Sequence, residues 1–162
     1  MHYDFKVTDI RRVIDGDTFD FEVDLGFHAR MTKRFRLAGI DTAEIWGTNA
    51  EPAGTEQRDW VEQWLRDVAM RGELRIRTFK LNWNVPLADG GFGRWAGIVY
   101  NGLTMEFLSN ALVAAGFTKL GEPLWIWDSV EKIQNEMVEL HGMASRQAYE
   151  LIESGDLTPR EE

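Results

Sequence analysis

Residues 5–25 read FKVTDIRRVIDGDTFDFEVDL, two runs rich in β-branched and aromatic residues on either side of a short acidic turn. Such runs favour strands, and Asp-Gly-Asp at residues 15–17 is a strong turn signal between residues 5–13 and 18–25. The stretch therefore predicts a β-hairpin near the start of the chain, from which the rest of a sheet can grow.

The segment after the hairpin, residues 31–37, alternates with the period of a half-buried strand. Arg34 and Arg36 fall on one face. The other face holds the residues that the pattern places toward the core: Met31, Lys33, Phe35 and Leu37. A third strand is therefore expected, with both arginines pointing the same way.

In the middle of the chain the spacing of apolar residues changes from that of a strand to that of a helix. Apolar residues recur at helical spacing between residues 55 and 70, and Gly72 follows where a helix would stop. Residues 74–81 and 95–100 then read as a fourth and a fifth strand, and Asn-Gly at residues 101–102 reads as a tight turn.

The last third of the sequence reads as helices. The first is expected over residues 104–116, where Gly116 marks its end. Asp128 or Ser129 can cap a further helix, and Gly142 is a candidate break before a last segment that reaches Ile152.

The order of these elements is three strands, a helix, two strands and then helices. It suits an α+β fold that is mainly β, a five-stranded barrel of the oligonucleotide-binding type with flanking helices, although the pattern alone does not choose it over another small α+β fold. We expect the barrel domain to cover residues 1–120. Residues 121–162 are expected to form an acidic helical extension that packs on or follows the same domain.

The composition excludes several classes of protein. The chain has 162 residues, of which 44% are hydrophobic and 28% are charged, which fits one globular domain, and we favour a monomer. No apolar run has the 18 residues of a membrane span, and no signal sequence is visible at the N-terminus, so a cytoplasmic protein is expected. Because cysteine is absent, disulfides and thiolate metal sites are excluded.

The net charge of −9 opposes contact with a polyanion, since lysine and arginine supply most nucleic-acid affinity. The acidic residues are unevenly placed, however: residues 1–100 carry 14 basic and 16 acidic side chains, and residues 101–162 carry 4 and 11. A divalent cation held in the first part would bring that part close to neutrality. Weak, metal-dependent binding of nucleic acid is the expectation.

Acidic and basic groups gather at the ends of the predicted strands. Arg36 is followed closely by Asp41 and Glu44, and the hairpin turn supplies Asp17. Carboxylates of this kind can ligate a hard divalent ion if the two turns meet. Arg94, which begins the fifth strand after a glycine, has the planar fork that suits a phosphate group.

Several blocks of the sequence resemble the staphylococcal nuclease (thermonuclease) family, over roughly residues 7–120. The blocks occur in the family's order: Ile-Asp-Gly-Asp-Thr at residues 14–18, Arg-Leu at 36–37, Ile-Asp-Thr-Ala-Glu at 40–44, Glu-Pro-Ala-Gly at 51–54, Phe-Gly-Arg at 92–94, and Gly102 with the helix to Gly116. The resemblance implies an oligonucleotide-binding barrel and a Ca²⁺-dependent nuclease that cleaves DNA or RNA.

The resemblance also implies roles for individual residues. Asp17, Asp41 and the carbonyl of Thr42 would bind Ca²⁺, and Glu44 would reach the ion through water and help to activate the attacking water. Ala43 departs from the family, which usually has proline there, so a less rigid loop is expected.

Two arginines would act on the phosphate, again by resemblance. Arg36 and Arg94 would hold the phosphate and stabilise its five-coordinate transition state. Asp15 is interpreted differently, as a structural residue whose side chain holds the hairpin turn.

Two alternatives remain open from the sequence. One is a catalytically weak or inactive barrel that binds nucleic acid or a protein partner. The other is a structural domain in which calcium only helps the chain to fold. The retention of both Arg36 and Arg94 favours the enzyme, because neither alternative requires them.

Overall fold

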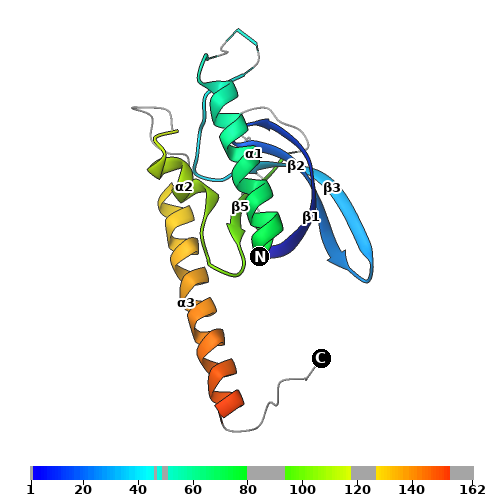
Figure 1. Cartoon of the computed structure of the whole chain (residues 1–162), viewed down its shortest axis with the longest axis vertical. Helices are drawn as coiled ribbons and strands as arrows, with labels where there is room; N and C mark the ends of the chain where they lie inside the picture. Colours follow the sequence, from blue (N-terminus) through cyan, green and yellow to red (C-terminus); the bar gives the residue numbers. More distant parts are fainter. Residues whose placement is uncertain (1, 46, 49–50, 80–93, 118–126, 154–162) are drawn as a thin grey trace. The chain divides into compact units, whose positions relative to one another are not determined.

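The computed structural model describes residues 2–45, 47–48, 51–79, 94–117 and 127–153. Within this part of the chain five strands form a closed barrel in the order β1-β2-β3-β5-β4 (Figure 1). The strands are β1 (His2–Asp15), β2 (Thr18–Gly26), β3 (Ala29–Leu37), β4 (Leu74–Phe79) and β5 (Arg94–Asn101). The predicted α+β, mainly β barrel is therefore confirmed, and its assignment to the oligonucleotide-binding type stays a prediction.

The predicted hairpin is confirmed by the antiparallel pairing of β1 with β2. The side chains of β2 alternate, so that Phe19, Phe21 and Val23 are buried in the barrel. The rings of Phe19 and Phe21 stack with their centroids 5.2 Å apart. At the turn, the backbone N–H of Asp17 donates to the side chain of Asp15 at 3.1 Å, as expected for a residue that holds the turn.

The third strand is confirmed, but its predicted burial is only half right. Phe35 and Leu37 are buried, whereas Met31 and Lys33 are exposed. The reason is topological: β5 runs parallel to β3 only from Arg34 to Leu37. The outer half of β3 therefore extends past β5 in the described part of the chain and is exposed, whereas Phe21 and Val23 on the paired strand β2 stay buried.

The first predicted helix is α1 (Gly54–Arg71), which contacts β1 and β4. Its face of Val61, Leu65 and Val68 is buried in the hydrophobic core. Gly72 ends the helix, with its N–H donating to the carbonyl of Val68 at 2.8 Å.

The helix expected over residues 104–116 is shorter than predicted. In the structure α2 spans Leu108–Ala114; residues 102–104 form a turn after β5, and Phe107 forms an isolated bridge with Tyr100. Gly116 follows the helix with a φ of 75°, a conformation that glycine adopts without strain.

The last helix, α3, spans Trp127–Glu153. It runs through Gly142, so the expected break there is wrong; one glycine costs a helix interior only about 1 kcal/mol, which a long helix tolerates. The helix begins before Asp128 and Ser129, which lie in its first turn and not at its cap. The chain divides into two compact units, Met1–Trp127 and Asp128–Glu162.

None of the three helices in the described part of the chain is long and apolar enough to cross a membrane. The candidate site lies in the first unit, where the β1–β2 turn meets the loop after β3. It is built from residues 15–18 and residues 36–44.

Candidate active site

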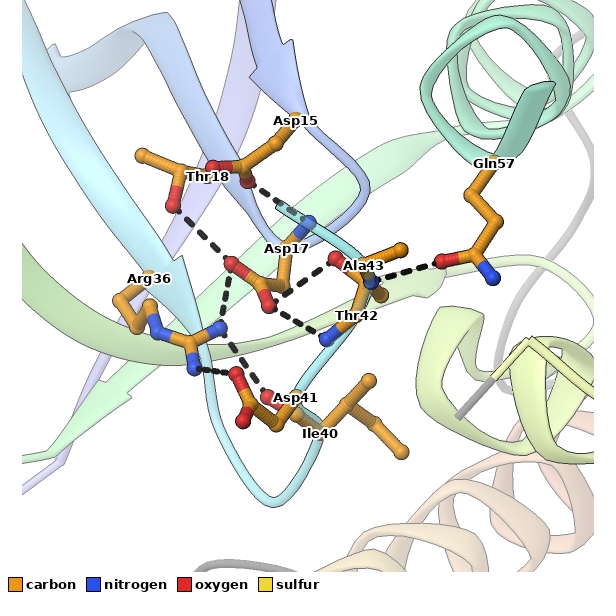
Figure 2. A network of polar contacts seen from close by, with 9 residues as sticks. All are labelled: Asp15, Asp17, Thr18, Arg36, Ile40, Asp41, Thr42, Ala43 and Gln57. Atoms are coloured by element: carbon orange, nitrogen blue, oxygen red, sulfur yellow. Dashed lines mark hydrogen bonds and ion pairs between the residues drawn. The ribbon is translucent and has the colours of Figure 1, made fainter. Parts of the chain in front are cut away.

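Asp17 is the buried centre of the site (Figure 2). Its Oδ2 accepts hydrogen bonds from the backbone N–H of Thr42 at 2.8 Å and from the Thr42 hydroxyl at 3.1 Å. Its Oδ1 accepts a hydrogen bond from the hydroxyl of Thr18 at 3.1 Å. This one carboxylate therefore ties the β1–β2 turn to the loop that follows β3, so the two turns meet, which was the condition for a shared site.

Arg36 lies between two carboxylates. Its guanidinium forms ion pairs with Oδ1 of Asp17 and, at 3.0 Å, with Oδ1 of Asp41. The same group donates to the carbonyl of Ile40 at 3.0 Å. The side chain of Arg36 is only 13% exposed, so these contacts are made largely away from water. We call Asp17, Arg36 and Asp41 the site cluster; it holds two acids and one base.

Burial dominates the protonation of Asp17. It raises the pKa of this carboxyl to about 7, although Arg36 and the N–H of Thr42 favour the charged form; the nearby carboxylate of Asp15 adds to the rise. Burial acts to lower the pKa of Arg36, but the charges of Asp17 and Asp41 outweigh it and the pKa of Arg36 is raised. The cluster thus keeps its arginine charged and its inner aspartate close to titration at neutral pH, a state that a further cation would shift toward the carboxylate.

The loop that carries Asp41 is held at several backbone groups. The N–H of Ala38 donates to the carbonyl of Gly97 at 2.9 Å, where the loop leaves β3. Further along, the N–H of Ala43 donates to Oε1 of Gln57 at 2.9 Å. Ala43 was expected to loosen this loop because it replaces proline, but its N–H gives the loop an anchor that proline cannot provide.

Glu44 and Arg94 are the two other predicted catalytic residues. Glu44 is half-buried, and its carboxylate has no hydrogen bond or ion pair in the described part of the chain. Arg94 begins β5 and is paired in register with Arg34, two residues before the pair of Arg36 and Ala96. The side chain of Arg94 lies outside the described residues. The structure therefore brings together Asp17, Arg36, Asp41 and Thr42, and places Glu44 on the same loop.

The fit of a metal ion can be judged from the donor groups. Carboxylate and carbonyl oxygens such as those of Asp17, Asp41 and Thr42 are the ligands that Ca²⁺ prefers. Within the described residues no three acidic or histidine side chains converge as a ready metal site. The donor set fits a hard divalent ion in its chemistry, and such an ion would compete with Arg36 for the oxygens of Asp17 and Asp41.

Gln57 was missed in the sequence. It is a buried polar residue on the face of α1 that otherwise turns apolar residues to the core, such as Val61 and Leu65. A polar residue in an apolar helical stripe is the signal that could have found it, since buried polar groups need partners.

Comparison of the sequence with protein-family models and with curated proteins finds no match.

Proposed function

We propose that this protein is a calcium-dependent nuclease that hydrolyses phosphodiester bonds of DNA or RNA. The observation that carries the proposal is the guanidinium of Arg36, largely buried and held between Asp17 and Asp41 at the junction of a turn and a loop. A guanidinium fixed in this way suits a phosphate, and carboxylates are ligands that suit a hard cation.

Hydrolysis of a phosphodiester needs fixed positive charge. Attack by water builds negative charge on the phosphate oxygens, and a preorganised donor at that position is typically worth about 10² to 10³ in rate. Arg36 supplies such a donor, because the carbonyl of Ile40 holds one of its nitrogens in place. Arg94 would supply a second from the start of β5.

The attacking water needs a group that takes its proton. Glu44 suits this role, because its carboxylate is half-buried and has no partner within the described residues. Asp41, three residues earlier, is engaged by Arg36 and suits the role less well.

Calcium would be held by Asp17, Asp41 and the carbonyl of Thr42. When bound, it would polarise the phosphate and help to orient the substrate. The hydrogen bonds from Thr42 hold the side chain of Asp17 in place, and the ion would compete with Arg36 for its oxygens.

The strand order supports the proposal without deciding it. A closed barrel in the order β1-β2-β3-β5-β4, with α1 between β3 and β4, is compatible with the oligonucleotide-binding type. A fold hosts many functions, however, so the argument rests on the site cluster.

A second candidate is a barrel that binds nucleic acid or a protein without cleaving it. One observation favours it: Asp17 already accepts hydrogen bonds from Thr18 and Thr42 and pairs with Arg36, as a purely structural carboxylate would. In this alternative the site cluster only holds the β1–β2 turn against the loop after β3, and Glu44 has no functional role.

Cleavage assays separate the two candidates. The protein is incubated with single-stranded DNA, duplex DNA and RNA, each with Ca²⁺, with Mg²⁺ and with a chelator. The nuclease proposal expects cleavage of at least one substrate that calcium stimulates and the chelator stops. Binding without any calcium-stimulated cleavage would favour the second candidate.

A further inference from the structure

The first turn of α1 supports the loop of the site from outside the charged cluster. Oε1 of Gln57 accepts the hydrogen bond from the N–H of Ala43 at 2.9 Å, and the Gln57 residue is only 8% exposed (Figure 2). A buried N–H that loses its partner is costly, so this contact is a strong restraint on the loop.

A second observation at the same turn concerns the carbonyl group of the following residue, Glu44. A Cβ placed on Gly54 would lie 2.7 Å from the carbonyl oxygen of Glu44 and 2.9 Å from its carbonyl carbon. The start of α1 can approach the loop this closely only because residue 54 is glycine. The same carbonyl accepts the N–H of Glu51 at 2.7 Å. The backbone of Glu44 is therefore fixed by the segment that leads into α1.

Successive backbone N–H groups of the loop donate first to the site cluster and then to helix α1. The N–H of Thr42 donates to the carboxylate of Asp17, and the very next N–H, that of Ala43, donates to Gln57. Two successive peptides held from different sides leave little freedom for the chain to rotate between them. The directions in which the side chains of Asp41 and Glu44 leave the loop are set by this arrangement.

We propose that Gln57 is a positioning residue of the nuclease site, which keeps Glu44 in place through Ala43 without touching the substrate. The inference rests on the proposed function. Gln57 supplies a neutral acceptor, so it holds the loop without adding a further negative charge beside Asp17 and Asp41. A residue that acts in this way should affect the catalytic step more than substrate binding.

The chain offers a matched control in Asn101. It is also 8% exposed, and its Oδ1 accepts backbone N–H groups, that of Leu103 at 3.0 Å and that of Glu73 at 3.3 Å. It supports the turn after β5 and makes none of the site contacts. Gln57→Met and Asn101→Leu each replace one buried amide by an apolar side chain of similar length.

The test compares these variants in steady-state cleavage of a single-stranded oligonucleotide with calcium, alongside amide hydrogen exchange. Gln57→Met should lower kcat about 10-fold with KM changed less than about 2-fold, and should speed exchange in residues 41–45. Gln57→Glu keeps the acceptor but adds the negative charge that the amide avoids, so its kcat should fall between those of Gln57→Met and the wild type. Gly54→Ala should also lower kcat, because its methyl group displaces the carbonyl of Glu44. Asn101→Leu should leave kcat unchanged.

Two results would overturn the inference: a wild-type kcat in Gln57→Met, or an equal loss of kcat in Asn101→Leu, which would indicate a general effect of stability. If the wild-type protein cleaves nothing, the proposed function fails, and exchange alone decides what Gln57 does. Faster exchange confined to residues 41–45 in Gln57→Met then supports its role in holding the loop, and unchanged exchange there contradicts it.

Discussion

Two of the clusters of carboxylate and guanidinium groups in the described part of the barrel are built in different ways. The wall cluster consists of Asp4, Glu73, Arg75, Arg77 and Tyr100, from β1, β4, β5 and the residue before β4. One carboxylate, that of Asp4, accepts from Arg75 at 2.8 Å, from Arg77 at 3.0 Å and from the hydroxyl of Tyr100 at 2.6 Å. The site cluster instead places one guanidinium between two carboxylates.

Strand register accounts for the wall cluster and not for the site cluster. Asp4 lies opposite Arg77, and Arg75 lies opposite Tyr100, so the contacts follow from neighbouring strands. Its charges balance, and the side chain of Asp4 is 24% exposed, against 7% for Asp17. Because its charges balance, the wall cluster needs no bound ligand. The site cluster comes from a turn and a loop, and it joins one largely buried guanidinium to two carboxylates.

The sharpest contrast between the clusters should appear in catalysis. Glu44→Gln removes the proposed proton acceptor on the site loop and should lower the cleavage rate about 10² to 10⁴-fold. Glu73→Gln changes the carboxylate that pairs with Arg75 in the wall cluster and should leave the rate unchanged. Initial rates on a single-stranded oligonucleotide measure both. An equal effect of the two changes would remove the distinction between the clusters.

Stability should separate the clusters next. Asp17→Ala leaves Arg36 and the N–H of Thr42 without a buried partner and should cost about 3 kcal/mol of unfolding free energy. Asp4→Ala acts on a more exposed cluster and should cost about 1 kcal/mol. Urea denaturation of both variants provides the comparison; a larger loss for Asp4→Ala would reverse our assignment of the deeper cluster.

Added calcium should stabilise the protein through one cluster only. At about 100 times its dissociation constant, free calcium should add about 2.7 kcal/mol to the unfolding free energy. The gain should persist in Asp4→Ala and vanish in Asp17→Ala. Thermal unfolding with and without a chelator shows it, and a calcium effect that survives in Asp17→Ala would place the ion elsewhere.

The two clusters should also titrate in different pH ranges. Burial raises the pKa of Asp17 from 3.8 to about 7, so its contribution to stability is complete below pH 3.8 and is lost as the pH rises through 7. Burial and Asp4 raise the pKa of Tyr100 from 10.0 to about 12, so its contribution is lost as the pH rises through 12. The stability difference between wild type and Asp17→Ala should change between pH 4 and 7, and that between wild type and Tyr100→Phe should not change there.

The elements that depend on local sequence pattern could be predicted from the sequence. The alternation of residues 18–25 and the acidic turn before them gave the hairpin, and the apolar stripe of α1 gave the first helix. That Asp17 and Asp41 would share a site was implied by the family resemblance, whereas the pattern left open whether their two turns meet. The pattern could not show that Met31 is exposed, because that depends on where β5 begins, far along the chain.

Contacts between segments that are far apart in the chain could not be predicted from the sequence. Arg36 was expected to hold phosphate, and its pairing with Asp17 and Asp41 depends on how the turn and the loop meet in space. Gln57 is 14 residues from Ala43, and no short motif links them. Both features are set by tertiary packing, which a pattern of neighbouring residues does not encode.

The most direct test of the account is one rate comparison: cleavage of a single-stranded oligonucleotide, with calcium and with chelator, by wild type, Arg36→Lys and Arg77→Lys. Lysine keeps the charge but loses the planar fork. We predict that wild type and Arg77→Lys cleave at equal rates, only with calcium, and that Arg36→Lys is about 10² to 10³-fold slower. Absence of calcium-dependent cleavage by the wild type, or equal rates for all three proteins, would contradict the proposal that the site cluster is the active site.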